Sequence, residues 1–308
     1  MRDTVIRTLI EEAKANKDIE LITGDLGFGV LKPFYEQLPN QFTNAGIAEQ
    51  SMTGIAAGMA LSGKTVFTYS IGNFPTLRCV EQIRNDCAYM KANVKIICVG
   101  GGFVYGSLGM SHHATEDLAV MRAIPGVSVF APGDPEEVEA VVPVMLRKKG
   151  TCYLRLGRGG EPKVHAQPLA GYRMPEALTL RSGRDVAILS TGGILTQAVG
   201  AAELLSGLGI EAEVLSFPCL KPLDMDTLTG LCRRFRLLVT VEEHTVIGGL
   251  GSAVCEAVAE RGLGARVYRI GMNDCFSTIV GTQQYLREAY DMSADRIAER
   301  VQALLKDA

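Results

Sequence analysis

The sequence has no block of basic residues and no long apolar run. Its 31 Lys and Arg residues are balanced by 34 Asp and Glu residues, which gives a net charge of -3 over 308 residues. A mildly acidic chain offers no electrostatic case for nucleic acid or a membrane surface. Its apolar stretches, such as VKIICVGGGFV, fall short of the roughly 20 residues that cross a bilayer. We therefore expect neither a nucleic-acid partner nor a membrane partner.

The sequence also lacks paired metal-binding or redox cysteines. None of the eight cysteines forms a Cys-x-x-Cys pair, and the four histidines are not spaced with them as zinc ligands. Scattered cysteines inside apolar runs are typical of a reducing compartment. The N-terminal stretch 1–18 predicts an amphipathic helix, and its acidic residues exclude a signal peptide. These patterns predict a cytoplasmic protein without a metal ligand set.

Strand-like and helix-like segments alternate along the chain. Strands are expected at 19–24, 64–70, 94–100, 127–132, 152–156, 185–192, 211–217, 236–243 and 265–270. Helical patterns separate most of them, and a final amphipathic helix follows Ser293. This alternation predicts an α/β protein with two doubly wound domains, each a mostly parallel sheet with helices on both faces.

A break in this rhythm predicts the domain boundary. Residues 158–184 are rich in Gly, Pro and Arg and have no clear period, which is typical of a linker. The expected domains are 1–157 and 185–308. Glycine pairs at 192–193 and 248–249 each follow a strand, but the second misses the G-x-G-x-x-G spacing of a dinucleotide loop, and tight packing explains both.

One carboxylate has an unusual position. Glu49 lies in the segment FTNAGIAEQSMTGIAAGMA (42–60), at the start of a helix that is otherwise small and apolar. A glutamate there can simply stabilise the helix dipole. A ligand that requires a buried carboxylate is the other explanation.

Two further segments offer candidate site residues. The glycine-rich loop 100–118 follows a strand and contains His112 and His113, whose side chains suit proton transfer near neutral pH. Tyr69 and Phe74 lie at a strand end, where an aromatic ring can stack on a heteroaromatic ligand. The alternative to a functional role is a structural one. The histidines would then hold the loop in place, and the aromatic rings would pack in the core.

The order of these segments resembles a known family. GIAEQ (46–50), TYSIGNF (68–74), Ser-His-His (111–113) and then AIPGVSVFAPGDPEE (123–137) are similar to the thiamine-diphosphate enzymes of the transketolase family. The likeness is to their pyrimidine-binding domain followed by their C-terminal domain, which VEEHTVIGGLGSAV (241–254) also resembles. It covers nearly the whole chain and is strongest to the separate C-terminal subunit of a split transketolase.

The resemblance implies roles for several residues. Glu49 would bond the N1′ nitrogen of thiamine diphosphate and promote the imino tautomer that activates the thiazolium carbon. Phe74, or less well Tyr69, would stack on the pyrimidine. His112 matches a histidine near the substrate carbonyl, with His113 beside it at a position that is glutamine in the family. Arg158 matches an arginine that holds a sugar phosphate.

The sequence also departs from the family pattern. Leu108 and Gly100 stand where transketolases carry an Asp and a His, and Gly29 replaces a phosphate-binding Ser. The magnesium-binding Gly-Asp-Gly…Asn motif is missing from the chain. The resemblance therefore implies that a separate N-terminal transketolase subunit carries this motif and holds Mg²⁺ and the diphosphate. A homodimer of this chain within a heterotetramer is the expected assembly, with small sugars as substrates.

Other functions remain open at this stage. The β subunit of a 2-oxoacid dehydrogenase E1 shares the half-site, although such subunits usually show a different helix-start motif. A 1-deoxyxylulose-phosphate synthase-like reaction uses it too. A non-catalytic scaffold on the same fold would need none of Glu49, Phe74 and His112.

Overall fold

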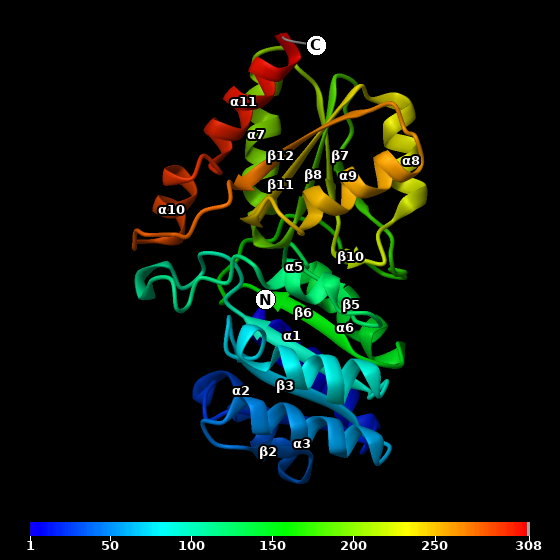
Figure 1. Cartoon of the computed structure of the whole chain (residues 1–308), viewed down its shortest axis with the longest axis vertical. Coiled ribbons are helices and arrows are strands. Elements are labelled where there is room, and N and C mark those ends of the chain that lie inside the picture. Colours follow the sequence, from blue (N-terminus) through cyan, green and yellow to red (C-terminus); the bar gives the residue numbers. More distant parts are fainter. Residues whose placement is uncertain (307–308) are drawn as a thin grey trace.

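The computed structural model describes residues 1–306, which form two α/β domains stacked along the long axis (Figure 1). The first sheet has seven strands in the order β10-β5-β6-β4-β3-β1-β2, and the second has five in the order β12-β11-β8-β9-β7. Every strand pair is parallel except β10 with β5 and β7 with β9. The predicted fold class is confirmed.

The first domain begins with an amphipathic helix and alternates strands with helices. Its elements are α1 (Arg2–Ala15), β1 (Ile19–Thr23), α2 (Phe28–Gln37), β2 (Phe42–Asn44), α3 (Glu49–Leu61), β3 (Thr65–Ile71), α4 (Val80–Gln82) with a π-helical continuation (Ile83–Tyr89), β4 (Val94–Val99), α5 (Asp117–Ala123), β5 (Ser128–Phe130), α6 (Pro135–Arg147) and β6 (Cys152–Leu156).

The second domain repeats this pattern with two added short strands. Its elements are β7 (Leu178–Arg181), β8 (Val186–Thr191), α7 (Leu195–Gly207), β9 (Ala212–Ser216), β10 (Cys219–Lys221), α8 (Met225–Arg234), β11 (Leu237–Thr245), α9 (Leu250–Glu260), β12 (Arg266–Met272), α10 (Gln283–Ala289) and α11 (Ala294–Lys306).

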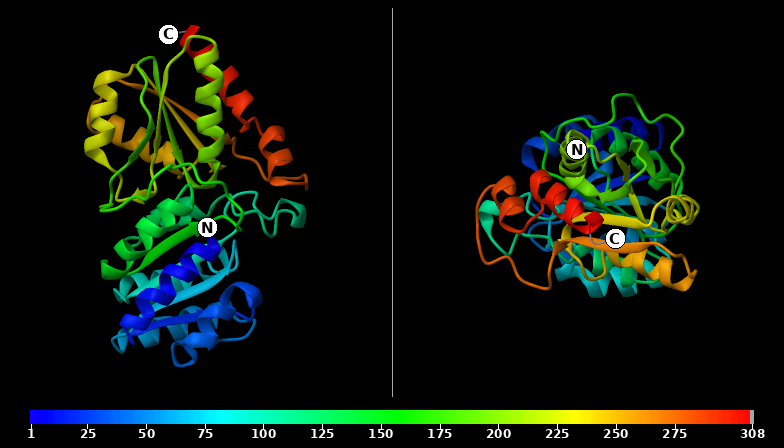
Figure 2. Two further views of the ribbon diagram at one scale, coloured as in Figure 1. Left: turned by 180° about the vertical axis from the view of Figure 1, so that it is seen from behind. Right: turned by 90° about the horizontal axis from the view of Figure 1, so that it is seen from above.

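Helices cover both faces of each sheet because the central strands are apolar on both sides. Helices α1, α2 and α6 pack on one face of the first sheet, while α7 and α11 pack on one face of the second (Figures 1 and 2). A third apolar cluster contains residues of both domains, such as Met52 and Ile83 from the first and Leu228 and Leu250 from the second. Continuous apolar packing therefore joins the domains.

Three short strands, β2, β7 and β10, were not expected from the sequence. Strand β7 lies inside the segment 158–184, and its half-exposed residues show no clear alternation of burial. Strand β10 follows β9 in the chain but pairs with β5 of the first sheet. Strands β2, β7 and β10 have only three or four residues, too few to show a periodicity by themselves, and their pairing depends on the assembled sheets. Among residues 1–306, no helix combines the length and apolar character needed to cross a bilayer.

Candidate active site

The candidate residues come from loops that follow neighbouring strands of the first sheet. Glu49 begins α3 after β2, Phe74 follows β3, and His112 lies in the long loop after β4. In a parallel sheet these loops share the edge formed by the carboxyl ends of the strands, where ligands bind in such folds.

Glu49 is buried and has one charged partner. Its side chain is only 4% exposed, and Oε2 accepts a 2.7 Å hydrogen bond from Nη1 of Arg78. A Cβ at Gly24 would lie 3.6 Å from Cγ of Glu49 and 3.4 Å from the carbonyl oxygen of Gly46. Gly24, directly after β1, therefore lies in ordinary van der Waals reach of the Glu49 side chain.

Phe74 lies beside the same arginine. The guanidinium carbon of Arg78 is 4.6 Å from the centroid of the Phe74 ring, within the range of a cation–π contact. The edge of the Phe74 ring faces His112, with the two ring centroids 5.2 Å apart. Arg78 and Phe74 therefore connect Glu49 to His112 in one continuous set of contacts.

Asn73 ties the two loops together. Its Nδ2 donates to the carbonyl oxygens of Ser111, at 3.3 Å, and His113, at 3.0 Å. The Ser111 hydroxyl lies 3.0 Å from Nδ1 of His112. Burial lowers the pKa of His112 below its usual value, and neighbouring His113 lowers it further. A neutral imidazole at pH 7 can both donate and accept a hydrogen bond.

The adjacent histidines have different surroundings. His113 is 2% exposed, packs edge-on against Phe103 and donates from Nε2 to the carbonyl oxygen of Gly106 at 3.0 Å. The same carbonyl accepts from the backbone N–H of Gly281 in the second domain. Figure 1 shows this loop projecting from the side of the molecule below α10. His113 and the C-terminal domain thus support the loop that carries His112.

Tyr69 and Arg158 lie further from Glu49 in the contact network. Tyr69 is 2% exposed and belongs to the apolar cluster beneath α1 and α2, where burial raises its pKa. Arg158 is exposed, and its guanidinium lies 5.8 Å from the Tyr105 ring centroid. Tyr105 in turn meets His112 edge-on at 6.3 Å. The structure therefore brings Phe74, and not Tyr69, against the partner of Glu49.

Sequence reasoning missed Arg78, Asn73 and Tyr105. Asn73 lies in the segment TYSIGNF (68–74) beside Phe74, Arg78 follows that segment by four residues, and Tyr105 lies in the glycine-rich loop 100–118. Arg78 carried no helical signal, because Phe74 lies in a turn and Arg78 in the short 3₁₀ helix Leu77–Cys79. Asn73 and Tyr105 carried no signal either, since their contacts join separate loops.

One group of potential metal ligands uses its oxygen atoms to accept hydrogen bonds within the protein. Asp134, Glu137 and His165 bring ligand atoms within 4.8 Å of one another. Asp134 accepts from the backbone N–H groups of Glu137, Val164 and His165, while Glu137 accepts from Gly133 N–H and faces Nε2 of His165 at 2.9 Å. These bonds hold the segment after β6 against the start of α6, so we interpret the role of the group as structural.

Comparison with known proteins identifies the family. Residues 1–162 match the transketolase pyrimidine-binding domain, and residues 176–297 match the transketolase C-terminal domain. The chain belongs to the transketolase family. The eight cysteines of this transketolase-family chain are all free thiols, five of them buried.

Several relatives match over almost their full length. A putative transketolase C-terminal section from Methanocaldococcus jannaschii is 37% identical, with 99% of this chain and 96% of the relative covered. One of the subunits of an apulose-4-phosphate transketolase from Phocaeicola vulgatus is 37% identical, with 89% and 87% covered. A 6-deoxy-6-sulfo-D-fructose transketolase subunit from Clostridium is 36% identical, with 96% and 92% covered.

A solved structure supports the same assignment. A split-gene transketolase, described as an inactive β4 tetramer, superposes with a TM-score of 0.90 at 37% identity, covering 99% of this chain and 98% of that one. A transketolase from Pichia stipitis at 20% identity shares the fold, with a TM-score of 0.81, and this chain covers 45% of it. The predicted likeness to the separate C-terminal subunit of a split transketolase is confirmed.

Proposed function

We propose that this chain is the pyrimidine-binding subunit of a transketolase that moves a two-carbon ketol unit from a ketose to an aldose, and that it works only with a separate diphosphate-binding subunit. The observation that carries the proposal is the contact between buried Glu49, Arg78, Phe74 and His112 in a chain of this family. A scaffold on the same fold would not need a buried carboxylate beside an aromatic face and a histidine.

The residues fit the aminopyrimidine ring of thiamine diphosphate. That ring presents a flat π face and nitrogen atoms that can bear a proton. In this structure the planar, cationic guanidinium of Arg78 stacks on Phe74 and donates a hydrogen bond to Glu49. Phe74 and Glu49 can therefore bind a flat group that carries a protonated nitrogen. When bound, the cofactor supplies the nucleophilic carbon that such ketol transfer requires.

Each residue has a defined role in this proposal. Glu49 would hold a proton on the pyrimidine nitrogen, and Phe74 would fix the plane of the ring. Tyr69, buried in the core, would set the strand end that carries Phe74. His112 would donate to the oxygen of the reacting carbonyl group, and His113 would position it. Arg158 would bind an anionic group of the sugar.

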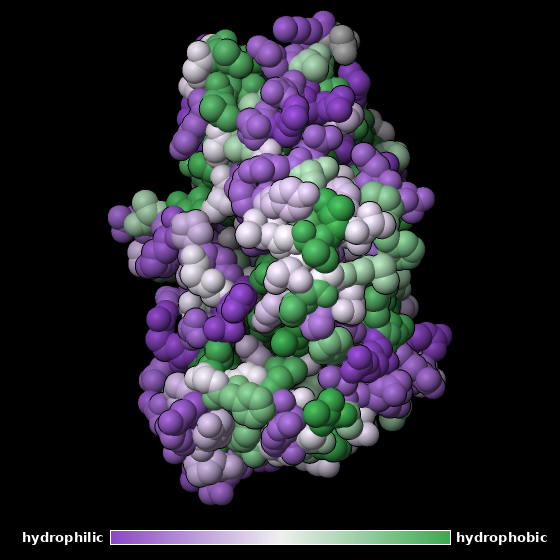
Figure 3. All heavy atoms as spheres, turned by 90° about the vertical axis from the view of Figure 1, so that its left-hand side faces the viewer, coloured by the Kyte–Doolittle hydropathy of each residue, from purple (hydrophilic) through white to green (hydrophobic). Residues whose placement is uncertain are grey.

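The proposed partner holds Mg²⁺ and the diphosphate. The carboxylate cluster at Asp134 and Glu137 does not suit a hard cation, because hydrogen bonds already fill its oxygens. Large apolar side chains near the candidate site are exposed, with Ile47 79% and Leu108 and Met110 each 54% accessible. Figure 3 shows hydrophobic side chains interspersed with polar ones over one face of the molecule. These side chains support burial by another chain.

The names of the relatives guide the choice of substrate. Apulose 4-phosphate and 6-deoxy-6-sulfofructose are both sugars with a terminal anionic group. We propose a ketose of this class as donor, with Arg158 facing the anion. A 1-deoxyxylulose-phosphate synthase-like reaction is less favoured, because this chain spans 47% of such a relative at 33% identity. The eight free cysteines support a reducing cytoplasm as its location.

The test is reconstitution. This chain is co-purified with a candidate partner that carries Gly-Asp-Gly…Asn, and the complex is supplied with thiamine diphosphate and Mg²⁺. Phosphorylated, sulfonated and neutral ketoses are screened with aldehyde acceptors. Transfer of a two-carbon unit that needs both chains supports the proposal. Decarboxylation of a 2-oxoacid without ketol transfer would contradict it.

A further inference from the structure

The loop that carries His112 is closed at its base by two backbone hydrogen bonds. The N–H of Gly102 donates to the carbonyl oxygen of Ala114 at 2.7 Å, and the N–H of Ala114 donates back to Gly102 at 3.0 Å. Residues 103–113 lie between these two positions and project from the side of the molecule (Figure 1). The groups that hold this base therefore decide where His112 lies.

The end of strand β11, in the second domain, contacts the base of the loop. Oε1 of Glu243 accepts a 2.6 Å hydrogen bond from the backbone N–H of Phe103, the first residue of the loop. The N–H of Thr245 donates to the carbonyl oxygen of Thr115 at 2.8 Å. Within residues 1–306 the buried N–H of Phe103 bonds no backbone carbonyl, so Glu243 supplies the acceptor that such a group requires.

A buried arginine joins Glu243 to the other side of the base. Nη2 of Arg155, in β6, donates to the backbone carbonyl oxygens of Ala114 and Glu243, both at 2.8 Å. The side chain of Arg155 is 4% exposed, and its Nε lies 3.0 Å from a carboxylate oxygen of Asp117. Both sides of the loop base are thus connected to Glu243, one directly and the other through Arg155.

Two glycines leave the space that these side chains occupy. A Cβ at Gly101 would overlap the side chain of Arg155, and a Cβ at Gly102 would overlap Oε1 of Glu243. Gly102 also has a φ of +65°, a conformation that favours glycine. The close approach of a carboxylate and a guanidinium therefore explains why the loop begins with glycines.

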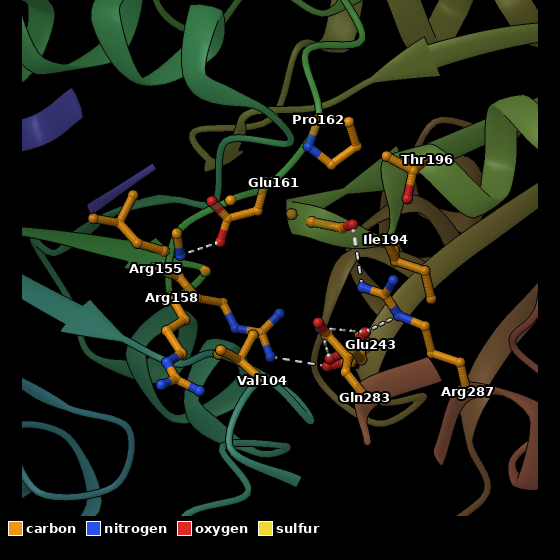
Figure 4. Close-up of a pocket in the computed structure, with 17 residues that line it drawn as sticks. Val104, Arg155, Arg158, Glu161, Pro162, Ile194, Thr196, Glu243, Gln283 and Arg287 are labelled. Atoms are coloured by element: carbon orange, nitrogen blue, oxygen red, sulfur yellow. Dashed lines mark hydrogen bonds and ion pairs between the residues drawn. The ribbon is translucent and has the colours of Figure 1, made fainter. Parts of the chain in front are cut away.

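The carboxylate of Glu243 is itself held in one orientation. Figure 4 shows it between Gln283 and Arg287 of helix α10. Nε2 of Gln283 donates to Oε1 at 2.8 Å, and Nε of Arg287 donates to Oε2. The Glu243 side chain is only 4% exposed. A buried carboxylate with a charge-assisted or amide donor on each oxygen is a rigid support.

Side-chain packing carries this support to the histidines. The ring of Phe103 stacks on Tyr290 of the second domain at 5.3 Å and meets the edge of His113 at 5.5 Å, measured between ring centroids. His113 adjoins His112 in the chain. We propose that Glu243 is a positioning residue for ketol transfer, which fixes the base of the loop from the second domain and so places His112 beside the reacting carbonyl group. This inference rests on the function proposed above.

Two variants separate the loop contact from general stability. Glu243→Gln keeps the size of the side chain, but its single amide oxygen cannot accept from both Phe103 and Arg287. Arg287→Met is the matched control, because it removes the same ion pair and leaves Glu243 facing Phe103. Thermal melting of the isolated chain verifies that each variant folds.

Amide hydrogen exchange of the isolated chain tests the contact and needs no substrate. In wild type, the Phe103 amide should be protected like the amides of β4. Loss of its acceptor should lower that protection at least about ten-fold in Glu243→Gln, and less than about three-fold in Arg287→Met. An unprotected Phe103 amide in wild type would overturn the proposal, and this outcome requires no variant to fold.

Kinetics of the reconstituted complex test the positioning role. A displaced catalytic group should lower kcat of Glu243→Gln about ten- to a hundred-fold, with KM for the ketose changed less than about two-fold. Arg287→Met should stay near the wild-type kcat. Equal losses of kcat in the two variants would overturn the positioning role. A wild-type complex without ketol transfer would contradict the proposed function instead, and exchange at Phe103 would still decide whether Glu243 holds the loop.

Discussion

Glu49 illustrates how a residue's surroundings separate a structural role from a chemical one. A glutamate at a helix start gains at most about 1 kcal/mol from the helix dipole, and such residues are usually exposed. Here the carboxylate is buried and bonded by an arginine that also stacks on Phe74. That arrangement exceeds what helix stability alone requires.

We expect Glu49→Gln to reduce turnover of the reconstituted complex by about 10²–10⁴-fold, because an amide cannot share a proton with a ring nitrogen. The amide oxygen still accepts a hydrogen bond from Arg78, so the unfolding free energy should change by no more than about 1 kcal/mol. Steady-state kinetics and thermal melting on one preparation measure both effects. If Glu49→Gln folds normally and keeps wild-type turnover, Glu49 has only a structural role.

Arg78 should matter for stability before it matters for chemistry. Arg78→Met leaves the buried carboxylate of Glu49 without its partner, which costs about 1–3 kcal/mol of unfolding free energy. Arg78→Lys keeps a cation and is the matched control, expected to lose less than the Met variant. Urea denaturation of the three proteins measures the difference. Equal stability of all three would show that the ion pair contributes nothing measurable.

His112 and His113 should separate cleanly in mutants. His112→Ala should lower turnover and leave the melting temperature nearly unchanged, because that ring is partly exposed. His113→Ala should destabilise the fold by about 2 kcal/mol, because it creates a cavity beside Phe103 and removes a hydrogen bond to Gly106. Melting curves and kinetics test the pair. A stable His113→Ala enzyme with lower turnover than His112→Ala would reverse these roles.

At the scale of elements, the segment after β6 is held to helix α6 by a contact between His165, which can titrate, and Glu137. Burial opposes protonation of His165, but the hydrogen bond and the negative charge of Glu137 outweigh it and raise its pKa above the usual 6.5. A raised histidine pKa contributes stability that is complete below pH 6.5 and is lost as pH rises through the folded-state pKa.

We therefore expect the segment near Val164 and His165 to open more readily at alkaline pH. Hydrogen-exchange protection factors of these amides, corrected for intrinsic rates, should be higher at about pH 6 than at about pH 9. His165→Gln can still bond Glu137 but does not titrate, so its protection should be independent of pH. The same pH dependence in wild type and His165→Gln would exclude this contact as the cause.

Most strands were predictable from the sequence, whereas β2, β7 and β10 were not. The strand expected at 94–100 is β4, and the strand expected at 152–156 is β6. Helix α8 and strand β10 were missed. Strand β10 exists because β5 offers an unpaired edge, which no local pattern in Cys219–Lys221 can encode.

At the scale of the whole molecule, the proposed function divides the active site between this chain and a partner chain. We expect the isolated chain to form a dimer or a higher oligomer, and the partner to convert it into a heterotetramer. Calorimetry should detect weak or no binding of thiamine diphosphate to the isolated chain, since we propose that the ligands of Mg²⁺ and the diphosphate belong to the partner. Light scattering measures the assembly. A monomer at micromolar concentration, or micromolar cofactor binding by the lone chain, would contradict the split site.

The sequence by itself determined the two-domain α/β architecture, the family, and Glu49, Phe74 and His112 as candidates. Periodicity and motifs depend on neighbours along the chain, so both can be recognised without coordinates. Only the tertiary structure decided that Arg78 reaches Glu49, that His113 turns inward while His112 faces Phe74, and that Arg155 meets the turn after β8. These contacts join residues distant in sequence, and packing of two complete sheets is what brings them together.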